Sequence, residues 1–259
     1  MNTRTACFLP GWGLGSAPLA RAFRQQDAAT RWQVQALPGS QPGERVPECF
    51  CDAVETLLVR LPEKKCHLGG WSLGAILALA LAARAPERIA SLTLIAATPC
   101  FVARPDWRNA CPPATFRAFT RKVERDGDGA LPAFIAGFCQ GDQTAESSRH
   151  FLEKYATPPS RAALAAGLRW LAEADLRTNI PAISCPVYLL HGENDPLTPL
   201  EAALWLARTL PQAHLTRLPG KAHAPFLNTP APAHFLRKCA HHEFQHQSPP
   251  LQEAGPPFL

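Results

Sequence analysis

The sequence predicts an α/β fold in which a mostly parallel sheet is flanked by helices and interrupted by a helical insertion. Short apolar runs alternate with helix-like segments along most of the chain, and one Gly-x-Ser-x-Gly sequence stands where such a run gives way to a helix. Between about residues 100 and 179 the strand-like runs disappear. Regular alternation of strands and helices is typical of a parallel sheet covered by helices.

The strands are expected at short apolar runs, several of them rich in Val, Ile, Leu or Thr. These runs are Thr5–Leu9, Gln33–Leu37, Cys66–Trp71, Ser91–Ala97, Pro186–His191 and His214–Leu218. The clearest helices are Gly74–Arg84, which Pro86 closes, and Pro199–Leu210, which Pro211 ends. Proline at position 199 suits the first turn of a helix.

The chain is expected to divide into four parts. Residues 1–100 form the first part of the core, residues 101–179 a helical cap, residues 180–240 the second part of the core, and residues 241–259 a flexible tail. The tail is polar and rich in proline. Weak metal binding by His241, His242 and His246 is an alternative to a solvated tail.

Composition excludes several classes of protein. The chain has 259 residues, 46% of them hydrophobic, and its longest apolar stretch, Ala75–Ala83, is too short to span a bilayer. Met1–Leu9 lacks the layout of a signal peptide. Nine cysteines without a Cys-x-x-Cys pair indicate free thiols, and the net charge of +5 is too dispersed to indicate nucleic-acid binding. We expect a cytoplasmic monomer without a membrane partner, metal or cofactor.

The serine of Gly70-Trp71-Ser72-Leu73-Gly74 is the candidate nucleophile. Between a strand and a helix, this pattern forces the serine into a tight, strained turn that lifts its hydroxyl above the edge of the sheet. Side chains two residues before and after it would collide, which explains both glycines. A serine hydroxyl needs a base and an acid that orients the base.

Both partners follow in the expected order, each in a loop after a predicted strand. Asp195 is the candidate acid and His223 the candidate base, with Glu193 as a competing acid. The other histidines outside the tail lie in or beside predicted strands and helices and are interpreted as structural. A metal site of Asp195, His191 and His223 is an alternative that no paired-ligand spacing supports.

Acyl transfer also requires two N–H donors for the developing oxyanion. The backbone N–H of Leu73, directly after the serine, is one candidate, and the N–H of Trp12 in the glycine-rich loop after the first strand is the other. That loop lacks the Gly-x-Gly-x-x-Gly spacing of a nucleotide cradle.

Three stretches together resemble the α/β-hydrolases, and in particular the pimeloyl-[acyl-carrier protein] methyl ester esterases of biotin synthesis. They are PGWGLGSAPL, GGWSLGAILALALAARAPERIASLTLIAATPCFVARPDW and LPGKAHAPFLNTPAPAHF. The resemblance covers most of both core segments and is diffuse in the cap. It implies hydrolysis of the methyl ester on a carrier-bound pimeloyl chain, with an acyl-carrier protein as partner.

The resemblance also implies roles for individual residues. Ser72, His223 and Asp195 correspond to the triad, Trp12 and Leu73 to the oxyanion donors, and Trp12, Trp71 and Phe134 to substrate contacts. Pro10 stands where the family usually has a histidine, which puts the geometry of the oxyanion loop in question.

Cap arginines receive the acidic carrier in the family, but several of those positions do not align here. Arg117, Arg121 and Arg125 are the candidates in this chain. They belong to a segment with six basic and two acidic residues, and such a patch can steer an acidic partner. A solvated helix face is the competing interpretation. The residues also leave open a broad short-chain carboxylesterase, a thioesterase, and a non-enzymatic ligand receptor on a hydrolase scaffold.

Overall fold

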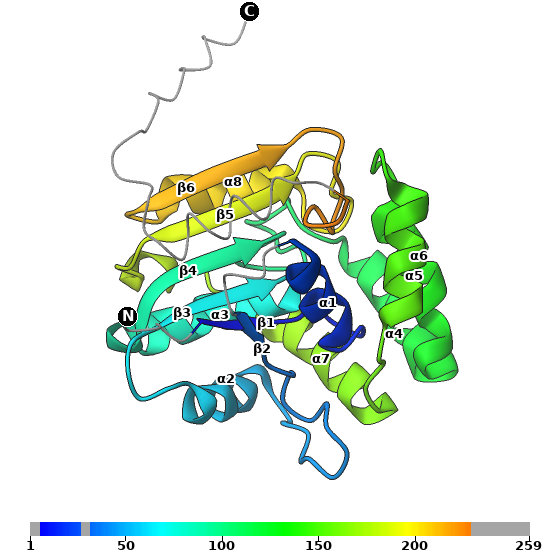
Figure 1. The fold of residues 1–259 in the computed structure, drawn as a ribbon, viewed down its shortest axis with the longest axis horizontal. Helices are drawn as coiled ribbons and strands as arrows, with labels where there is room; N and C mark the ends of the chain where they lie inside the picture. Colours follow the sequence, from blue (N-terminus) through cyan, green and yellow to red (C-terminus); the bar gives the residue numbers. More distant parts are fainter. Residues whose placement is uncertain (1–5, 27–31, 229–259) are drawn as a thin grey trace, which may run out of the picture.

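The computed structural model describes residues 6–26 and 32–228, and the predicted tail with its three histidines lies outside them. The described chain forms a parallel sheet of six strands in the order β2-β1-β3-β4-β5-β6 (Figure 1). All strands therefore end at the same edge of the sheet, which we call the carboxyl edge. The predicted fold class is confirmed.

The six strands coincide with the six predicted runs, with small shifts. They are β1 Ala6–Leu9, β2 Trp32–Val34, β3 Cys66–Trp71, β4 Ile89–Ile95, β5 Val187–Gly192 and β6 Ala213–Leu218. Strand β2 ends three residues before its predicted run, and β4 starts and ends two residues before its own. Strand β4 ends there because Ala96 adopts a left-handed backbone with φ of 50°, which a strand cannot continue.

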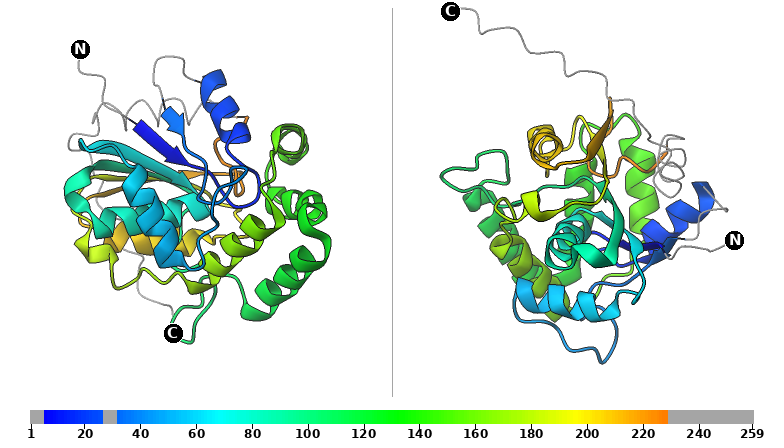
Figure 2. Two further views of the ribbon diagram at one scale, coloured as in Figure 1. Left: turned by 90° about the horizontal axis from the view of Figure 1, so that it is seen from below. Right: turned by 90° about the vertical axis from the view of Figure 1, so that its left-hand side faces the viewer.

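Helices cover both faces of the sheet. The helices α1 (Ala17–Gln26), α2 (Phe50–Arg60), α3 (Leu73–Arg84) and α8 (Leu200–Thr209) follow strands β1, β2, β3 and β5 in the chain. Figure 2 shows α1 on one face and α3 and α8 on the other. Helix α3 lies against β1, β3 and β4, and α2 packs on its outer side.

The longest apolar stretch of the sequence belongs to α3. Every residue from Leu73 to Ala82 is buried, as expected for a helix that is apolar on all sides and is enclosed in a core. Among the described residues no helix is both long and apolar enough to cross a membrane.

Four helices lie between β4 and β5, and we call them the inserted helices. They are α4 (Pro113–Asp126), α5 (Leu131–Cys139), α6 (Ala145–Tyr155) and α7 (Arg161–Glu173). Figure 1 shows α4, α5 and α6 beyond the arrowheads of the strands, next to the loop that follows β6. The inserted helices therefore face the carboxyl edge.

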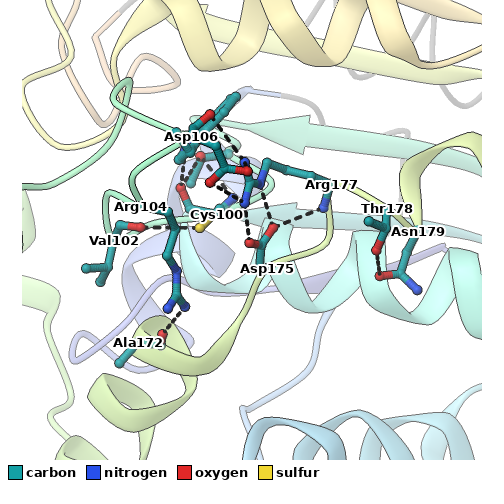
Figure 3. A network of polar contacts seen from close by, with 11 residues as sticks. Cys100, Val102, Arg104, Asp106, Ala172, Asp175, Arg177, Thr178 and Asn179 are labelled. Atoms are coloured by element: carbon teal, nitrogen blue, oxygen red, sulfur yellow. Dashed lines mark hydrogen bonds and ion pairs between the residues drawn. The ribbon is translucent and has the colours of Figure 1, made fainter.

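A network of polar contacts joins the two ends of the inserted segment, and we call it the base network (Figure 3). Arg177 lies 2.7 Å from Asp175 and 2.9 Å from Asp106. The Arg104 guanidinium donates to the carbonyl of Ala172 at 2.8 Å, and Cys100 forms an antiparallel bridge with Asp175. The base network thus bonds the segment through which the chain leaves the core to the segment through which it returns.

Candidate active site

Ser72 occupies the tight turn between β3 and α3 that the sequence predicts. Its φ of 57° and ψ of −119° lie in a region that non-glycine residues rarely adopt. Its backbone N–H donates to the carbonyl of Ile95 at 3.0 Å, and its carbonyl accepts from Ala75 at 2.9 Å. These bonds hold the strained residue at the N-terminus of α3.

The two glycines around Ser72 are required by close backbone approaches. A Cβ on Gly70 would collide with the carbonyl of Gly74, and a Cβ on Gly74 would collide with the carbonyls of Leu9 and Pro10. The second collision shows that the start of α3 packs directly on the loop after β1. The turn and that loop therefore form one rigid unit.

Asp195 and His223 meet at the carboxyl edge although 28 positions separate them in the chain. His223 Nδ1 lies 2.8 Å from Asp195 Oδ2, and both side chains are fully buried. Asp195 also accepts from the backbone N–H groups of Leu197 and Thr198, at 2.9 and 3.0 Å, and from the Thr198 hydroxyl at 2.6 Å. Glu193 instead lies 3.7 Å from Arg217.

The pKa of Asp195 is held below its ordinary value. Burial acts to raise it, but the neighbouring His223 and the hydrogen bonds from His223 and Thr198 outweigh the burial. Asp195 is therefore an ionised acceptor at neutral pH.

Two further residues surround Asp195: His191, which the sequence suggested only for the alternative metal site, and Thr198, which was not predicted as part of any site. His191 Nε2 donates to the Thr198 carbonyl at 2.7 Å and lies 3.7 Å from Asp195 Oδ2. Burial lowers the pKa of His191, so its ring is neutral. The spacing Asp195-x-x-Thr198 was the available signal for Thr198, because an aspartate often accepts from residues two and three positions later.

Trp71 ties the serine turn to the histidine loop, which comprises residues 219–226. Its indole Nε1 donates to the carbonyl of His223 at 2.8 Å, and the two rings lie 5.8 Å apart. Trp71 is 2% exposed and is not among the residues that line the pocket described below. The structure therefore places this predicted substrate contact behind the pocket, in a position that supports His223.

The backbone N–H groups of Trp12 and Leu73 have no hydrogen-bond acceptor within residues 6–26 and 32–228. Leu73 is the first residue of α3, where the N–H groups have no partner in the helix and the helix dipole is positive. Trp12 is held by α7, since its indole donates to the Leu164 carbonyl at 2.9 Å. Gly167 allows that approach, because a Cβ there would collide with the Trp12 indole.

A pocket of about 250 Å³ opens between Ser72 and the inserted helices. Its wall is mainly apolar and contains the predicted contacts Trp12 and Phe134. Phe134 lies with its ring centre 5.1 Å from those of Trp12, Phe119 and Phe138. Lys122 is the charged residue among the described side chains that line the pocket.

The three candidate carrier-binding arginines lie on α4, one turn apart, and all are exposed. Arg117 and Arg121 border a shallow surface hollow together with Phe116. Arg125 instead pairs with Asp126 at 2.7 Å, which offsets its charge. The predicted basic patch therefore centres on Arg117 and Arg121.

The arrangement combines a serine on a strained backbone turn, a histidine oriented by an ionised carboxylate, the two backbone N–H groups of Trp12 and Leu73, and an apolar pocket. These are the parts that acyl transfer through a serine requires. Among the described residues no group of three or more His, Cys, Asp or Glu side chains is placed to hold a metal ion. The alternative metal site thus has no structural support there.

Comparison with known proteins gives concordant results. Residues 8–230 match a family described as alpha/beta hydrolase fold. A pimeloyl-[acyl-carrier protein] methyl ester esterase of Aromatoleum aromaticum is 37% identical, over 89% of this chain and 95% of the relative. The protein of the same name from Nitrosomonas europaea is 35% identical, over 86% and 89%.

Solved structures are similar in fold. MenH from S. aureus superposes with a TM-score of 0.75 at 16% identity, over 94% of this chain and 95% of that one. A thermophilic esterase from Thermogutta terrifontis gives 0.71 at 24% identity, over 92% and 90%. At these identities the likeness concerns the fold alone.

Proposed function

We propose that the protein hydrolyses the methyl ester of a pimeloyl chain bound to an acyl-carrier protein. The proposal starts from its family: the chain belongs to the alpha/beta hydrolase fold family and, within it, to the pimeloyl-[acyl-carrier protein] methyl ester esterases. Two observations support the proposal: Ser72 lines an apolar pocket, and Trp71, the residue before it, donates to the carbonyl of His223, which is itself bonded to Asp195. The product would be the free carboxylate that biotin synthesis uses.

In the first step Ser72 Oγ attacks the ester carbonyl while His223 accepts its proton. Because Nδ1 of His223 donates to Asp195, Nε2 is the nitrogen that takes the proton. The oxyanion that forms would be bound by the N–H groups of Trp12 and Leu73. When the C–O bond to the methoxy group breaks, His223 returns the proton and methanol leaves.

In the second step water replaces methanol. His223 removes a proton from the water while the oxygen of the water attacks the acyl-enzyme, and His223 then gives that proton to Ser72 Oγ as the ester bond to Ser72 breaks. The pimeloyl carboxylate and the free serine are released. Asp195 remains ionised throughout and stabilises the imidazolium in both steps, which agrees with the lowered pKa of its carboxyl.

The inserted helices would act as the cap that selects the substrate. The aromatic wall formed by Phe119, Phe134 and Phe138 suits a methylene chain. Arg117 and Arg121 would receive the acidic carrier outside the pocket. We further propose that the protein acts in the cytoplasm and that it is a monomer. Sedimentation of the purified protein tests the monomeric state.

Turnover of two substrates tests the proposal. The purified protein is given the methyl ester of pimeloyl-acyl-carrier protein and, separately, p-nitrophenyl butyrate. Cleavage of the carrier-bound ester with the higher kcat/KM supports the proposal. Cleavage of the simple ester alone would instead indicate a broad carboxylesterase, and a carrier thioester cleaved in place of the methyl ester would indicate a thioesterase.

Two further measurements separate an enzyme from a receptor. A fluorophosphonate should label wild-type protein at Ser72 and leave Ser72→Ala unlabelled. The wild-type gene, but not the Ser72→Ala gene, should restore growth without biotin to a strain that lacks its own methyl esterase. A folded wild-type protein that takes no label would favour a ligand receptor.

A further inference from the structure

The histidine loop is fastened to the inserted helices at the turn between α5 and α6, residues 140–144. The N–H of Gln143 donates to the carbonyl of Gly220 at 2.8 Å, and the N–H of Ala222 donates to Asp142 Oδ2 at 3.1 Å. Lys221 Nζ lies 3.0 Å from Asp142 Oδ1. Three successive residues before His223 are therefore bonded to this one turn.

The charged pair at the centre of this contact is buried. Lys221 is 6% exposed and Asp142 is 8% exposed. Lys221 also donates to the Thr144 hydroxyl at 2.6 Å, and that hydroxyl donates to Asp142 Oδ1 at 2.8 Å. With the N–H groups of Thr144 and Ala222, Asp142 accepts four hydrogen bonds.

The pKa of Asp142 shows which effect dominates. Burial acts to raise it, yet the hydrogen bonds from Thr144, Ala222 and Lys221 hold it below the ordinary value. The carboxylate is therefore ionised at neutral pH, and Lys221 faces a full negative charge.

A buried ion pair contributes little net stability compared with apolar side chains of similar size, but it is directional. The loop with Asp195 joins the same contact, since the N–H of Asn194 donates to the Lys221 carbonyl at 2.9 Å and its side chain donates to the Gly141 carbonyl at 2.7 Å. The pair and the two bonds of Asn194 together hold the loops that carry the acid and the base against one turn of the inserted helices.

The same turn continues directly from the wall of the pocket. Helix α5 supplies Phe134 and Phe138 to that wall, and the Phe138 ring lies 5.4 Å from the His223 ring. His223 itself has only a long backbone bond to this helix, from its N–H to the Phe138 carbonyl at 3.5 Å. The strong polar contacts between the histidine loop and the turn are those of residues 220–222.

We propose that Asp142 and Lys221 are positioning residues for His223. Their ion pair locks the histidine loop to the α5–α6 turn, so that the base and the α5 wall of the pocket keep one relative position. The proposal rests on the proposed function, because it assigns His223 the role of general base. Neither residue is among those that line the pocket.

Lys221→Met and the double variant Asp142→Leu/Lys221→Met test the proposal. In the single variant an unpaired carboxylate remains buried, so both stability and kcat should fall. In the double variant both charges are gone, so stability should recover in part; the N–H groups of Thr144 and Ala222 still lose their acceptor. The kcat should stay lowered because the directional link is absent. A displacement of about 1 Å at a catalytic group lowers the rate by up to about 100-fold, and we expect a loss of 10-fold or more in kcat for p-nitrophenyl butyrate.

Three readouts distinguish positioning from a structural role. The rate of fluorophosphonate labelling at Ser72 should fall with kcat, KM for the small ester should change less than about twofold, and the downfield proton resonance of the His223–Asp195 bond should shift. Arg177→Met, which breaks an ion pair of the base network, is the control and should keep wild-type kcat. If the wild-type protein itself shows neither esterase activity nor labelling, the proposed function is refuted. The test of the ion pair instead compares the variants with an active wild type, so the two failures can be told apart.

A double variant with wild-type stability and wild-type kcat would overturn the proposal, as would a single variant with wild-type kcat. If neither variant folds, Asp142→Asn is measured in the same way. It keeps the size of the side chain and an oxygen acceptor but removes the negative charge that faces Lys221, and kcat within about twofold of wild type in that variant would also overturn the proposal.

Discussion

The carboxyl edge of the sheet and the inserted helices border the same pocket but contribute different chemistry to it. The edge contributes a strained serine and a buried, fully bonded pair, Asp195 and His223. The inserted helices contribute aromatic rings, such as Phe119 and Phe134, and exposed basic residues. The edge holds reacting groups in fixed places, whereas the helices offer an apolar surface.

This difference indicates a division of labour. Hydrogen-bonded groups lose function with displacements of about 1 Å, while apolar contacts lose free energy in proportion to the area removed. Changes at the edge should therefore lower kcat steeply. Changes in the helices should raise KM moderately and alter the choice of substrate, except at the α5–α6 turn that holds the histidine loop. The predictions below test that division from the largest expected effect to the smallest.

Ser72→Ala should have the largest effect, because it removes the nucleophile without enlarging a buried side chain. We expect kcat for any ester to fall on the order of 10⁵-fold to 10⁶-fold. Ester hydrolysis and fluorophosphonate labelling measure it. Ser184→Ala, at an exposed position, should retain wild-type activity. A Ser72→Ala protein with more than a hundredth of wild-type kcat would show that another nucleophile operates.

Asp195→Asn should lower kcat on the order of 10⁴-fold, because an amide cannot hold the imidazole in the required tautomer or stabilise its positive charge. The matched control is Glu193→Gln, two residues away, whose carboxylate faces Arg217. It should keep kcat within about twofold of wild type. The reverse ranking of the two variants would transfer the orienting role to Glu193.

Phe134→Ala should have a smaller and different effect, because it removes apolar surface from the pocket wall. Loss of an aromatic contact of about 1.5–3 kcal/mol corresponds to a rise in KM of about 10-fold to 100-fold. The rise should be largest for carrier-bound pimeloyl ester and small for p-nitrophenyl acetate, while kcat changes little. Phe151→Ala, on α6 outside the pocket lining, is the control. An equal rise for both esters would argue against a role in chain recognition.

The edge could be predicted from the sequence more completely than the inserted helices. The Ser72 turn, the loops with Asp195 and His223, and all six strands have local signals, such as apolar runs and glycines at fixed spacing. Local signals depend on neighbouring residues, which the sequence displays directly.

The contacts that the sequence did not reveal join distant segments. Lys221 and Asp142 are 79 positions apart, and neither lies in a pattern typical of a buried pair. Trp71 resembles a substrate contact because it is next to Ser72, but the side-chain direction that places it behind His223 depends on β3 and the histidine loop together. Such contacts arise from tertiary packing and have no spacing rule.

The base network provides the smallest expected effect, and it tests whether fastening the inserted helices matters for chemistry at the edge. Arg177→Met should reduce stability by about 1 kcal/mol, a typical value for a partly exposed charge-assisted pair, and lower Tm by about 2–4 °C. Arg84→Met, which breaks the exposed pair with Glu55, is the control and should change Tm by less than 1 °C.

The effect of Arg177→Met on stability should depend on pH in a defined direction. The Arg177 hydrogen bonds lower the pKa of the Asp175 carboxyl, so the pair stabilises the fold fully above the unfolded pKa of about 4 and loses that stabilisation as the pH falls through the lower folded value. The difference in Tm between wild type and Arg177→Met should therefore be largest near pH 7 and shrink below about pH 4, with kcat unchanged at pH 7. A tenfold loss of kcat at pH 7 would show that the base of the inserted helices also positions the edge, and the division between the two regions would then not hold.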